Sequence, residues 1–255
     1  MSKSIVCALM IGRKGSVGFP GKNVYPVLGR PLAAYPLMAA KNSRYVERIF
    51  VSTDSPEIMS IAREQGAELI ERPPELATKQ ALGEDVFAHG YHEIKRKFAT
   101  EGLEIEQIVL LFANAATLNS DLINKGVDIL RANEGFDSAV TTSVYNMWSP
   151  LRARKLGEDG CLSPMVPFET FGDPLKLNCD RDSQGDVHFA DMSISVVRPE
   201  CLENMEEGLL PQKWMGQRIA SIPNWGGCDV DYEWQVPMVE FWLRKHGFQE
   251  ASVKK

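Results

Sequence analysis

Length, composition and charge exclude several classes of protein. The chain has 255 residues, 44% of them hydrophobic, which is enough for a sizeable core and excludes a disulfide-stapled miniature or a disordered protein. Its 34 acidic residues outnumber its 28 basic ones, and a net charge of −6 argues against nucleic acid or an anionic membrane surface as a partner. The longest apolar runs fall well short of the roughly 18 residues of a transmembrane helix, so we expect no membrane span.

Strands and helices alternate along the first 145 residues. Nearly continuous apolar and β-branched residues predict strands at 4–11, 48–53, 67–71, 107–113 and 138–145. Helices are predicted at 31–42, from Pro56 onward, at 83–98 and at 119–132, and Ser55 and Asn119 can cap two of them. This order predicts an α/β protein: a Rossmann-like three-layer sandwich with a mostly parallel sheet covered on both faces.

The second half of the chain is less regular. Four prolines, Pro150, Pro164, Pro167 and Pro174, interrupt residues 146–184, where no period dominates. We interpret residues 146–190 as a small lobe inserted into a single domain that spans residues 1–255. Strands at 193–197 and 219–222 are expected to return to the main sheet, and residues 232–246 are expected to form a closing helix.

Five scattered cysteines indicate a reducing environment. Their number is odd and no CxxC pair occurs, so neither a disulfide framework nor a zinc site is expected. The apolar stretch 5–11 is short and is followed by Arg13 and Lys14 instead of a cleavage site, so no signal peptide is expected. The predicted location is the cytoplasm.

A loop rich in glycine and positive charge follows the first strand. Gly12, Gly15, Gly18 and Gly21 free the backbone, and Arg13, Lys14 and Lys22 supply three cations in an otherwise acidic chain. Backbone N–H groups and cations at the carboxyl end of a strand suit a polyphosphate ligand. The spacing fits neither the Walker A motif nor the GxGxxG fingerprint. The alternative is that the glycines only form turns and the cations are solvated.

The loop and three later blocks resemble one enzyme family. The loop matches at Arg13, Gly15, Ser16, Gly18, Pro20, Lys22 and Asn23; residues 51–55, residues 72–77 and the pair Asp229 and Asp231 follow in the family's order. In this combination the chain resembles the CMP-sialic acid synthetases, which are cytidylyltransferases that activate acidic sugars. The resemblance implies a fold of the nucleotide-diphospho-sugar transferase type and a homodimer, with the 146–190 lobe reaching the partner.

The resemblance also implies roles for individual residues. Arg13 and Lys22 would hold the phosphates of CTP, with further nucleotide contacts from Gly12, Gly15, Ser16, Asn23, Arg72 and Asn114. Asp229 and Asp231 alternate along an extended segment and can offer oxygen ligands on one side to Mg²⁺, which accepts one or two carboxylates beside substrate phosphates and water. The alternative is that Asp229 lies in a turn and Asp231 caps the last helix.

The departures from the family pattern concern the acceptor. Phe112 stands where the family has glutamine, and Leu82 stands where it has serine. Arg181 and Asp191 fall where the family has an arginine and an asparagine near the sugar, although Asp191 could simply precede a strand. The expected reaction joins CMP to a sialic acid-like or other 2-keto-3-deoxy sugar acid. Two alternative functions remain open. One is cytidylyl transfer to a phosphonate or other phosphorylated acceptor, and the other is non-catalytic binding of nucleotide sugars.

Overall fold

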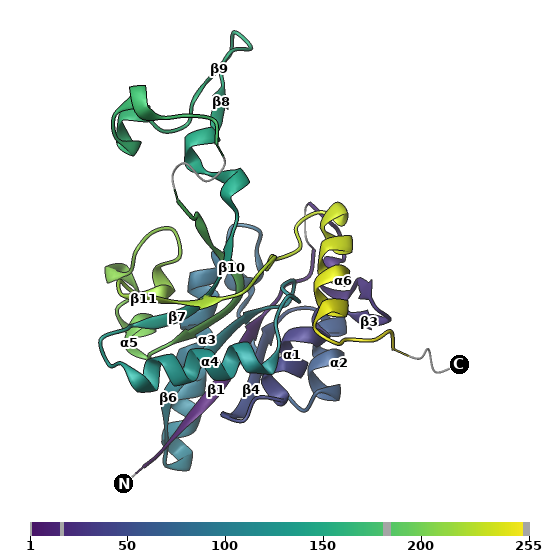
Figure 1. Ribbon diagram of the computed structural model, residues 1–255. Helices are drawn as coiled ribbons and strands as arrows, with labels where there is room; N and C mark the ends of the chain where they lie inside the picture. The colour runs from purple at the N-terminus through teal and green to yellow at the C-terminus, as the bar shows by residue number, and fades with distance from the viewer. Residues whose placement is uncertain (1, 16–17, 181–184, 252–255) are drawn as a thin grey trace.

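A seven-stranded sheet forms the centre of the molecule. The computed structural model describes residues 2–15, 18–180 and 185–251. The strand order is β11-β7-β10-β6-β1-β4-β5 (Figure 1). The strands are β1 (Lys3–Ile11), β4 (Val46–Thr53), β5 (Glu68–Glu71), β6 (Leu103–Phe112), β7 (Ser138–Val144), β10 (His188–Val197) and β11 (Ile219–Pro223). The helices are α1 (Ala34–Lys41), α2 (Pro56–Glu64), α3 (Gly83–Glu101), α4 (Ser120–Ala132), α5 (Glu200–Glu203) and α6 (Val236–Lys245).

The sheet is mostly parallel, as predicted. Only β10 runs against its neighbours, β6 and β7, whereas β1 pairs in parallel with both β4 and β6, and β11 pairs in parallel with β7. β7 and β10 follow one another along the chain within this sheet, because β8 and β9 form a separate ribbon. The long connection between β7 and β10 acts as the loop of a hairpin, so the two strands lie antiparallel.

Helices cover both faces of the sheet, which confirms the three-layer prediction. Alternate residues of β1 point to opposite faces: Ala8 and Met10 pack in one hydrophobic cluster with α1, α2 and α4, while Cys7 and Leu9 pack in another with α3 and α5. The last helix, α6, packs against residues 27–35 in a third cluster. Burial on both faces explains the nearly continuous apolar runs of the central strands β1 and β6.

The predicted helix caps are confirmed, whereas several element boundaries differ from those predicted. The Ser55 side chain accepts from Ile58 N, and that of Asn119 accepts from Leu122 N. The first helix begins at Ala34, because Arg30–Pro31 (β3) pairs with Pro26–Val27 (β2) in a hairpin. The closing helix begins at Val236 after a 3-10 turn at Glu233–Gln235, and β10 begins at His188, five residues earlier than predicted.

The irregular segment between β7 and β10 projects from the sheet (Figure 1). It contains short 3-10 turns and a two-stranded ribbon, β8 (Arg154–Leu156) and β9 (Leu162–Pro164). Large apolar side chains are exposed along it, among them Met147, Trp148, Leu156, Leu162 and Leu175.

Among the described residues, no helix combines the length and the apolar character that crossing a membrane requires.

Candidate active site

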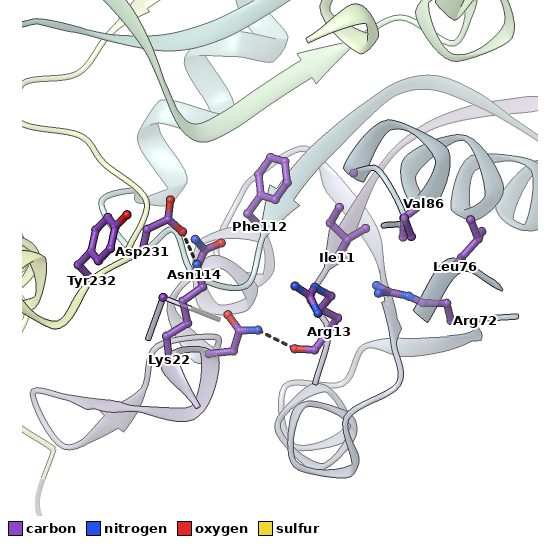
Figure 2. Close-up of a pocket in the computed structure, with 15 residues that line it drawn as sticks. Ile11, Arg13, Lys22, Arg72, Leu76, Val86, Phe112, Asn114, Asp231 and Tyr232 are labelled. Carbon is purple, nitrogen blue, oxygen red and sulfur yellow. Dashed lines mark hydrogen bonds and ion pairs between the residues drawn. The ribbon is translucent and has the colours of Figure 1, made fainter. Parts of the chain in front are cut away.

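One cavity lies at the edge of the sheet where the parallel strands end. Because β1, β4, β5 and β6 run in parallel, the loops after their carboxyl ends meet at this edge. The cavity has a volume of about 360 Å³. Seven of the predicted site residues line it, namely Gly12, Arg13, Lys22, Asn23, Arg72, Asn114 and Asp231, and so does Gly18 of the glycine loop (Figure 2). Ile11, Leu76, Val86 and Phe112 add an apolar wall.

Backbone contacts hold the start of the glycine loop against the sheet. Gly12 N donates to Ser52 O over 3.3 Å, and Lys14 N donates to Asp54 Oδ1 over 2.8 Å. A Cβ atom on Gly12 would lie 2.6 Å from that of Ala113, so only glycine lets the loop approach β6 this closely. These contacts fix the start of the loop at the carboxyl end of β1.

Two guanidinium groups meet in the cavity. Arg72 donates to Ser52 Oγ over 3.2 Å and also to the Ser52 carbonyl oxygen. Burial lowers the pKa of Arg72; the negative charge of Asp54 partly opposes this, and the positive charge of Arg13 adds to it. Positive charge gathered in a partly buried cavity favours an anionic ligand.

Asn23 has an unused acceptor beside the cavity. Its Nδ2 donates to Arg13 O over 3.2 Å, whereas its buried Oδ1 has no hydrogen-bond partner among the described residues. Buried polar atoms normally have a partner, and a missing one costs free energy. A hydroxyl or amino group of a ligand in the cavity would satisfy this oxygen.

Lys22 joins the loop to the carboxylate segment near the other end of the chain. Its Nζ lies 2.5 Å from Asp231 Oδ1, and the Lys22 side chain is only 13% exposed against 57% for Asp231. Gly18 approaches the same segment, since a Cβ atom there would lie 2.9 Å from Asp231 O. The Asp231 carboxylate thus pairs with Lys22, and the turn before α6 is capped by Gln235, whose Oε1 accepts from the backbone of Asp231 and Tyr232.

Asp229 lies behind Asp231, beside Asn114. Asn114 Nδ2 is 3.2 Å from Asp229 Oδ2 and 3.0 Å from Val230 O. Burial, and then the charge of Asp231, raise the pKa of Asp229, while Lys22 and the hydrogen bond from Asn114 lower it. Two neighbouring carboxylates, of which only Asp231 contacts the Lys22 ammonium, make a site that suits a further cation.

The two aspartates fit Mg²⁺ bound together with a substrate. The described residues hold no group of three or more His, Cys, Asp or Glu side chains that could bind a metal alone. Mg²⁺ is commonly held by one or two carboxylates, with substrate phosphates and water as its other ligands. Asp229 and Asp231 supply that number of carboxylates next to the cationic loop.

The raised pKa of Asp229 predicts a gain in stability for Asp229→Asn. The folded protein binds this proton more tightly than the unfolded chain, so the ionised carboxylate destabilises the fold above the raised pKa. Without metal or nucleotide, we expect Asp229→Asn to raise Tm by roughly 2–4 °C at pH 7, which corresponds to about 1 kcal/mol in a chain of this size. The gain should vanish as the pH falls below the ordinary pKa of aspartate. Thermal denaturation over a pH series measures it.

Asp231→Asn provides the comparison for this prediction. Asp231 is exposed and pairs with Lys22, so its substitution removes a favourable contact. We therefore expect no gain in Tm from Asp231→Asn. An Asp229→Asn variant that is less stable than wild type at pH 7 would contradict the prediction.

Several sequence-predicted residues lie elsewhere. Gly15 does not line the cavity, but its carbonyl accepts from Arg13 Nη1 over 3.0 Å. Asp191 lies in β10, 5% exposed, and its carboxylate takes part in a buried hydrogen-bond network instead of facing the cavity. This placement corrects the expectation that Asp191 contacts the acceptor. Ser16 and Arg181 are outside the described residues.

Ile11, Leu76, Val86 and Tyr232 line the cavity but were not predicted from the sequence to belong to the site. Ile11, Val86 and Leu76 follow the spacing of core residues, so the sequence carries no signal that separates them from the core. Tyr232 lines the cavity from the turn after Asp231. Its place follows from the path of that segment, which local sequence does not reveal.

Comparisons with known proteins agree on one family. The family model described as "Cytidylyltransferase" matches residues 7–134. A CMP-N,N'-diacetyllegionaminic acid synthase of Legionella pneumophila is 30% identical over 69% of this chain and 72% of its own length. An N-acylneuraminate cytidylyltransferase of Oncorhynchus mykiss is 28% identical over 92% of this chain and 50% of its own length. Across four curated relatives, the match spans only 20% to 50% of the relative's length.

A solved structure shows the same fold. The CMP:2-keto-3-deoxy-manno-octonic acid synthetase complexed with CTP superposes with a TM-score of 0.64 at 14% identity, covering 95% of this chain and 100% of the other. The fold is therefore that of the nucleotide-sugar transferases, as predicted. From the matched family model and the similarity to the Legionella synthase, the chain belongs to the cytidylyltransferase family that includes the N-acylneuraminate cytidylyltransferases, the CMP-sialic acid synthetases that its sequence resembles.

Proposed function

We propose that this chain transfers CMP from CTP to a hydroxyl group of an acidic sugar and releases pyrophosphate, with Mg²⁺ as cofactor. The acceptor is a sialic acid-like or other 2-keto-3-deoxy sugar acid. The observation that carries the proposal is the contact of Lys22 with Asp231 at the cavity, because it unites a phosphate-type glycine loop with a carboxylate pair more than 200 residues away.

The residues of the cavity suit each part of this reaction. The acceptor hydroxyl oxygen forms a bond to the α-phosphorus, the bond from that phosphorus to the bridging oxygen breaks, pyrophosphate leaves with the electron pair, and the hydroxyl proton passes to solvent. Arg13 and Lys22 hold the phosphates and stabilise the negative charge that develops on the leaving group. Mg²⁺ held by Asp229 and Asp231 would neutralise further phosphate charge.

The nucleoside and the acceptor would use the other side chains of the cavity. Asn23 Oδ1 accepts from a ligand hydroxyl or amino group, and Arg72 contributes hydrogen-bond donors elsewhere in the cavity. Phe112 packs against Phe87, with ring centroids 5.1 Å apart, and gives one wall of the cavity an apolar surface. An acceptor that presents a methyl or N-acetyl group suits such a wall better than one that presents only hydroxyl groups.

Pyrophosphate release tests the proposal and its rivals. The protein with Mg²⁺ is incubated with CTP, ATP, GTP or UTP, each beside N-acetylneuraminic acid, N,N'-diacetyllegionaminic acid, pseudaminic acid, 2-keto-3-deoxy-manno-octonic acid and a simple phosphonate. We expect release with CTP and at least one sugar acid. Release with the phosphonate alone would favour that rival, and CTP binding without release would favour a non-catalytic binding protein.

We also propose that the protein forms a homodimer through the projecting lobe. Leu156 and Leu162 face each other in the β8–β9 ribbon and are 73% and 68% exposed, which is unusual for large apolar side chains gathered on one projection. Light scattering after size exclusion should give about 57 kDa, twice the chain mass of 28.4 kDa. Leu156→Glu with Leu162→Glu should halve this mass, whereas Leu210→Glu, at an equally exposed leucine outside the lobe, should not. A monomeric wild type would contradict the proposal.

A further inference from the structure

The segment that carries the two aspartates is held partly by side chains of β7 and of the loops that follow β6 and β7. Between β11 and the turn before α6, residues 224–231 form an isolated bridge between Asp229 and Ala115, and Asn224 N and Val230 N donate to Thr142 O and Asn114 O, each over 2.9 Å. Gly227 N donates to Ser143 Oγ over 2.8 Å, and Cys228 N donates to Thr117 Oγ1 over 2.9 Å. Tyr145 also donates its hydroxyl to Gly227 O over 2.8 Å. The position of Asp229 and Asp231 therefore depends on these side chains together with the backbone contacts of the segment.

Asp191 is at the centre of these polar groups. Its Oδ1 accepts from Thr141 Oγ1 over 2.5 Å and from Ser193 N over 3.0 Å. Its Oδ2 lies 2.9 Å from Ser143 Oγ and 3.0 Å from Asn224 Nδ2. Oδ1 thus has two donors. On Oδ2, Asn224 is one donor, and the single hydroxyl proton of Ser143 is shared between this oxygen and the Asn224 carbonyl oxygen. Ser143 and Asn224 in turn hold the backbone of the segment.

The orientation of Asn224 is fixed by its other partners. Its Oδ1 accepts from Trp242 Nε1 over 3.2 Å, and its Nδ2 donates to Thr117 O over 3.0 Å as well as to Asp191. Turning the amide over would break both of these bonds. Asn224 therefore presents a donor to Asp191, and an amide at position 191 would bring two donors together, since the backbone N–H of Ser193 occupies the other oxygen.

The backbone of the segment lies directly on the Asp191 carboxylate. A Cβ atom on Gly227 would be 2.0 Å from Asp191 Oδ2 and 2.5 Å from Asn224 Nδ2. No side chain fits between the segment and this carboxylate, so the carboxylate sets the path of the chain two residues before Asp229.

We propose that Asp191 is a positioning residue, which places Asp229 and Asp231 opposite the glycine loop by ordering Ser143 and Asn224 beneath the segment. This inference rests on the proposed function, because it assigns the two aspartates to the reaction. Asp191 itself touches neither nucleotide nor acceptor. The carboxylate of Asp191 only accepts hydrogen bonds, and it therefore matches the donors buried around it, such as Ser193 N and Asn224 Nδ2.

The test compares Asp191→Asn with Asp137→Asn. Asp137 lies at the opposite end of β7, where its Oδ2 accepts from Gln217 N and Arg218 N, each over 2.8 Å, so it is a matched aspartate that anchors a loop away from the cavity. In Asp191→Asn we expect kcat to fall by about 10- to 100-fold with the KM for CTP within about threefold, because the loop that holds the phosphates is unchanged. Asp137→Asn should retain wild-type kcat.

Hydrogen exchange provides a readout that is independent of activity. In Asp191→Asn, the amides of Gly227, Cys228 and Val230 should exchange at least about tenfold faster, while that of Gly12 keeps its wild-type rate. In Asp137→Asn, these three amides should keep their wild-type rates. If wild type releases no pyrophosphate with any acceptor, the proposed function fails, and the exchange experiment still decides whether Asp191 holds the segment.

A milder variant covers the case in which Asp191→Asn does not fold. Ser143→Ala removes only the hydroxyl between Asp191 and Gly227 N. It should lower kcat and speed up amide exchange as Asp191→Asn does, but by smaller factors. Wild-type exchange and wild-type kcat in the variants that fold would overturn the inference. An equal loss of kcat in Asp137→Asn would overturn it as well, because destabilisation alone would then explain the effect.

Discussion

Replacing Asp231 with alanine is expected to lower kcat by about 10³-fold, the size of effect that follows loss of one strong electrostatic contact in a transition state. Asp231 is the carboxylate that lines the cavity, whereas Asp229 lies behind it. Steady-state pyrophosphate release at saturating CTP, Mg²⁺ and acceptor measures the loss.

The same variant should bind CTP differently when no metal is present. In the free protein the Lys22 ammonium is paired with Asp231, and this contact must give way if Lys22 is to bind a phosphate. Asp231→Ala frees Lys22, so we expect CTP to bind as tightly as in wild type or more tightly without Mg²⁺. In the presence of Mg²⁺ we expect wild type to bind CTP more tightly than Asp231→Ala does. Calorimetric titration under both conditions separates the two effects.

Glu233→Ala is the matched control for Asp231→Ala. Glu233 is an exposed acidic residue two positions further on, and it does not line the cavity. It should retain wild-type kcat and wild-type CTP binding. Full turnover in Asp231→Ala, or an equal loss in Glu233→Ala, would show that Asp231 has no specific role with the metal.

The second large effect is expected for Lys22→Ala, which should lower kcat/KM for CTP by about 10²- to 10³-fold. Lys22 is mostly buried, so the cavity holds its charge in surroundings where water screens it weakly. Its removal also takes away the positive charge that lowers the pKa of Asp229. The acidic limb of the pH–rate profile should therefore move to higher pH, because Asp229 must be ionised to bind a cation.

Lys14→Ala tests whether position or total charge matters. The Lys14 side chain is exposed and does not line the cavity, and its contact with Asp54 is made by the backbone, which the substitution leaves in place. Kinetics in the same pH series should show little change in Lys14→Ala. If this variant loses as much activity as Lys22→Ala, the loop acts through its net charge, and the assigned role of Lys22 is wrong.

Most of the fold could be predicted from the sequence because its signals are local. Apolar runs marked β1, β4, β5, β6, β7 and β11 within a few residues, and Ser55 and Asn119 marked the starts of α2 and α4. The antiparallel course of β10 could not be predicted, because a strand buried on both faces has the same composition in either direction. The hairpin at Pro26–Pro31 was missed since its strands are two residues long.

The sequence by itself determined the chemical groups of the candidate site: the glycine loop with Arg13 and Lys22, the guanidinium of Arg72 and the carboxylates of Asp229 and Asp231. Only the tertiary structure decided their geometry. It paired Lys22 with Asp231, left Asn23 Oδ1 without a partner among the described residues, and placed Asp191 beneath the segment that carries Asp229 and Asp231 instead of in the cavity. The physical reason is that side-chain chemistry is a property of each residue, whereas burial and hydrogen-bond partners arise from contacts between segments far apart in the chain.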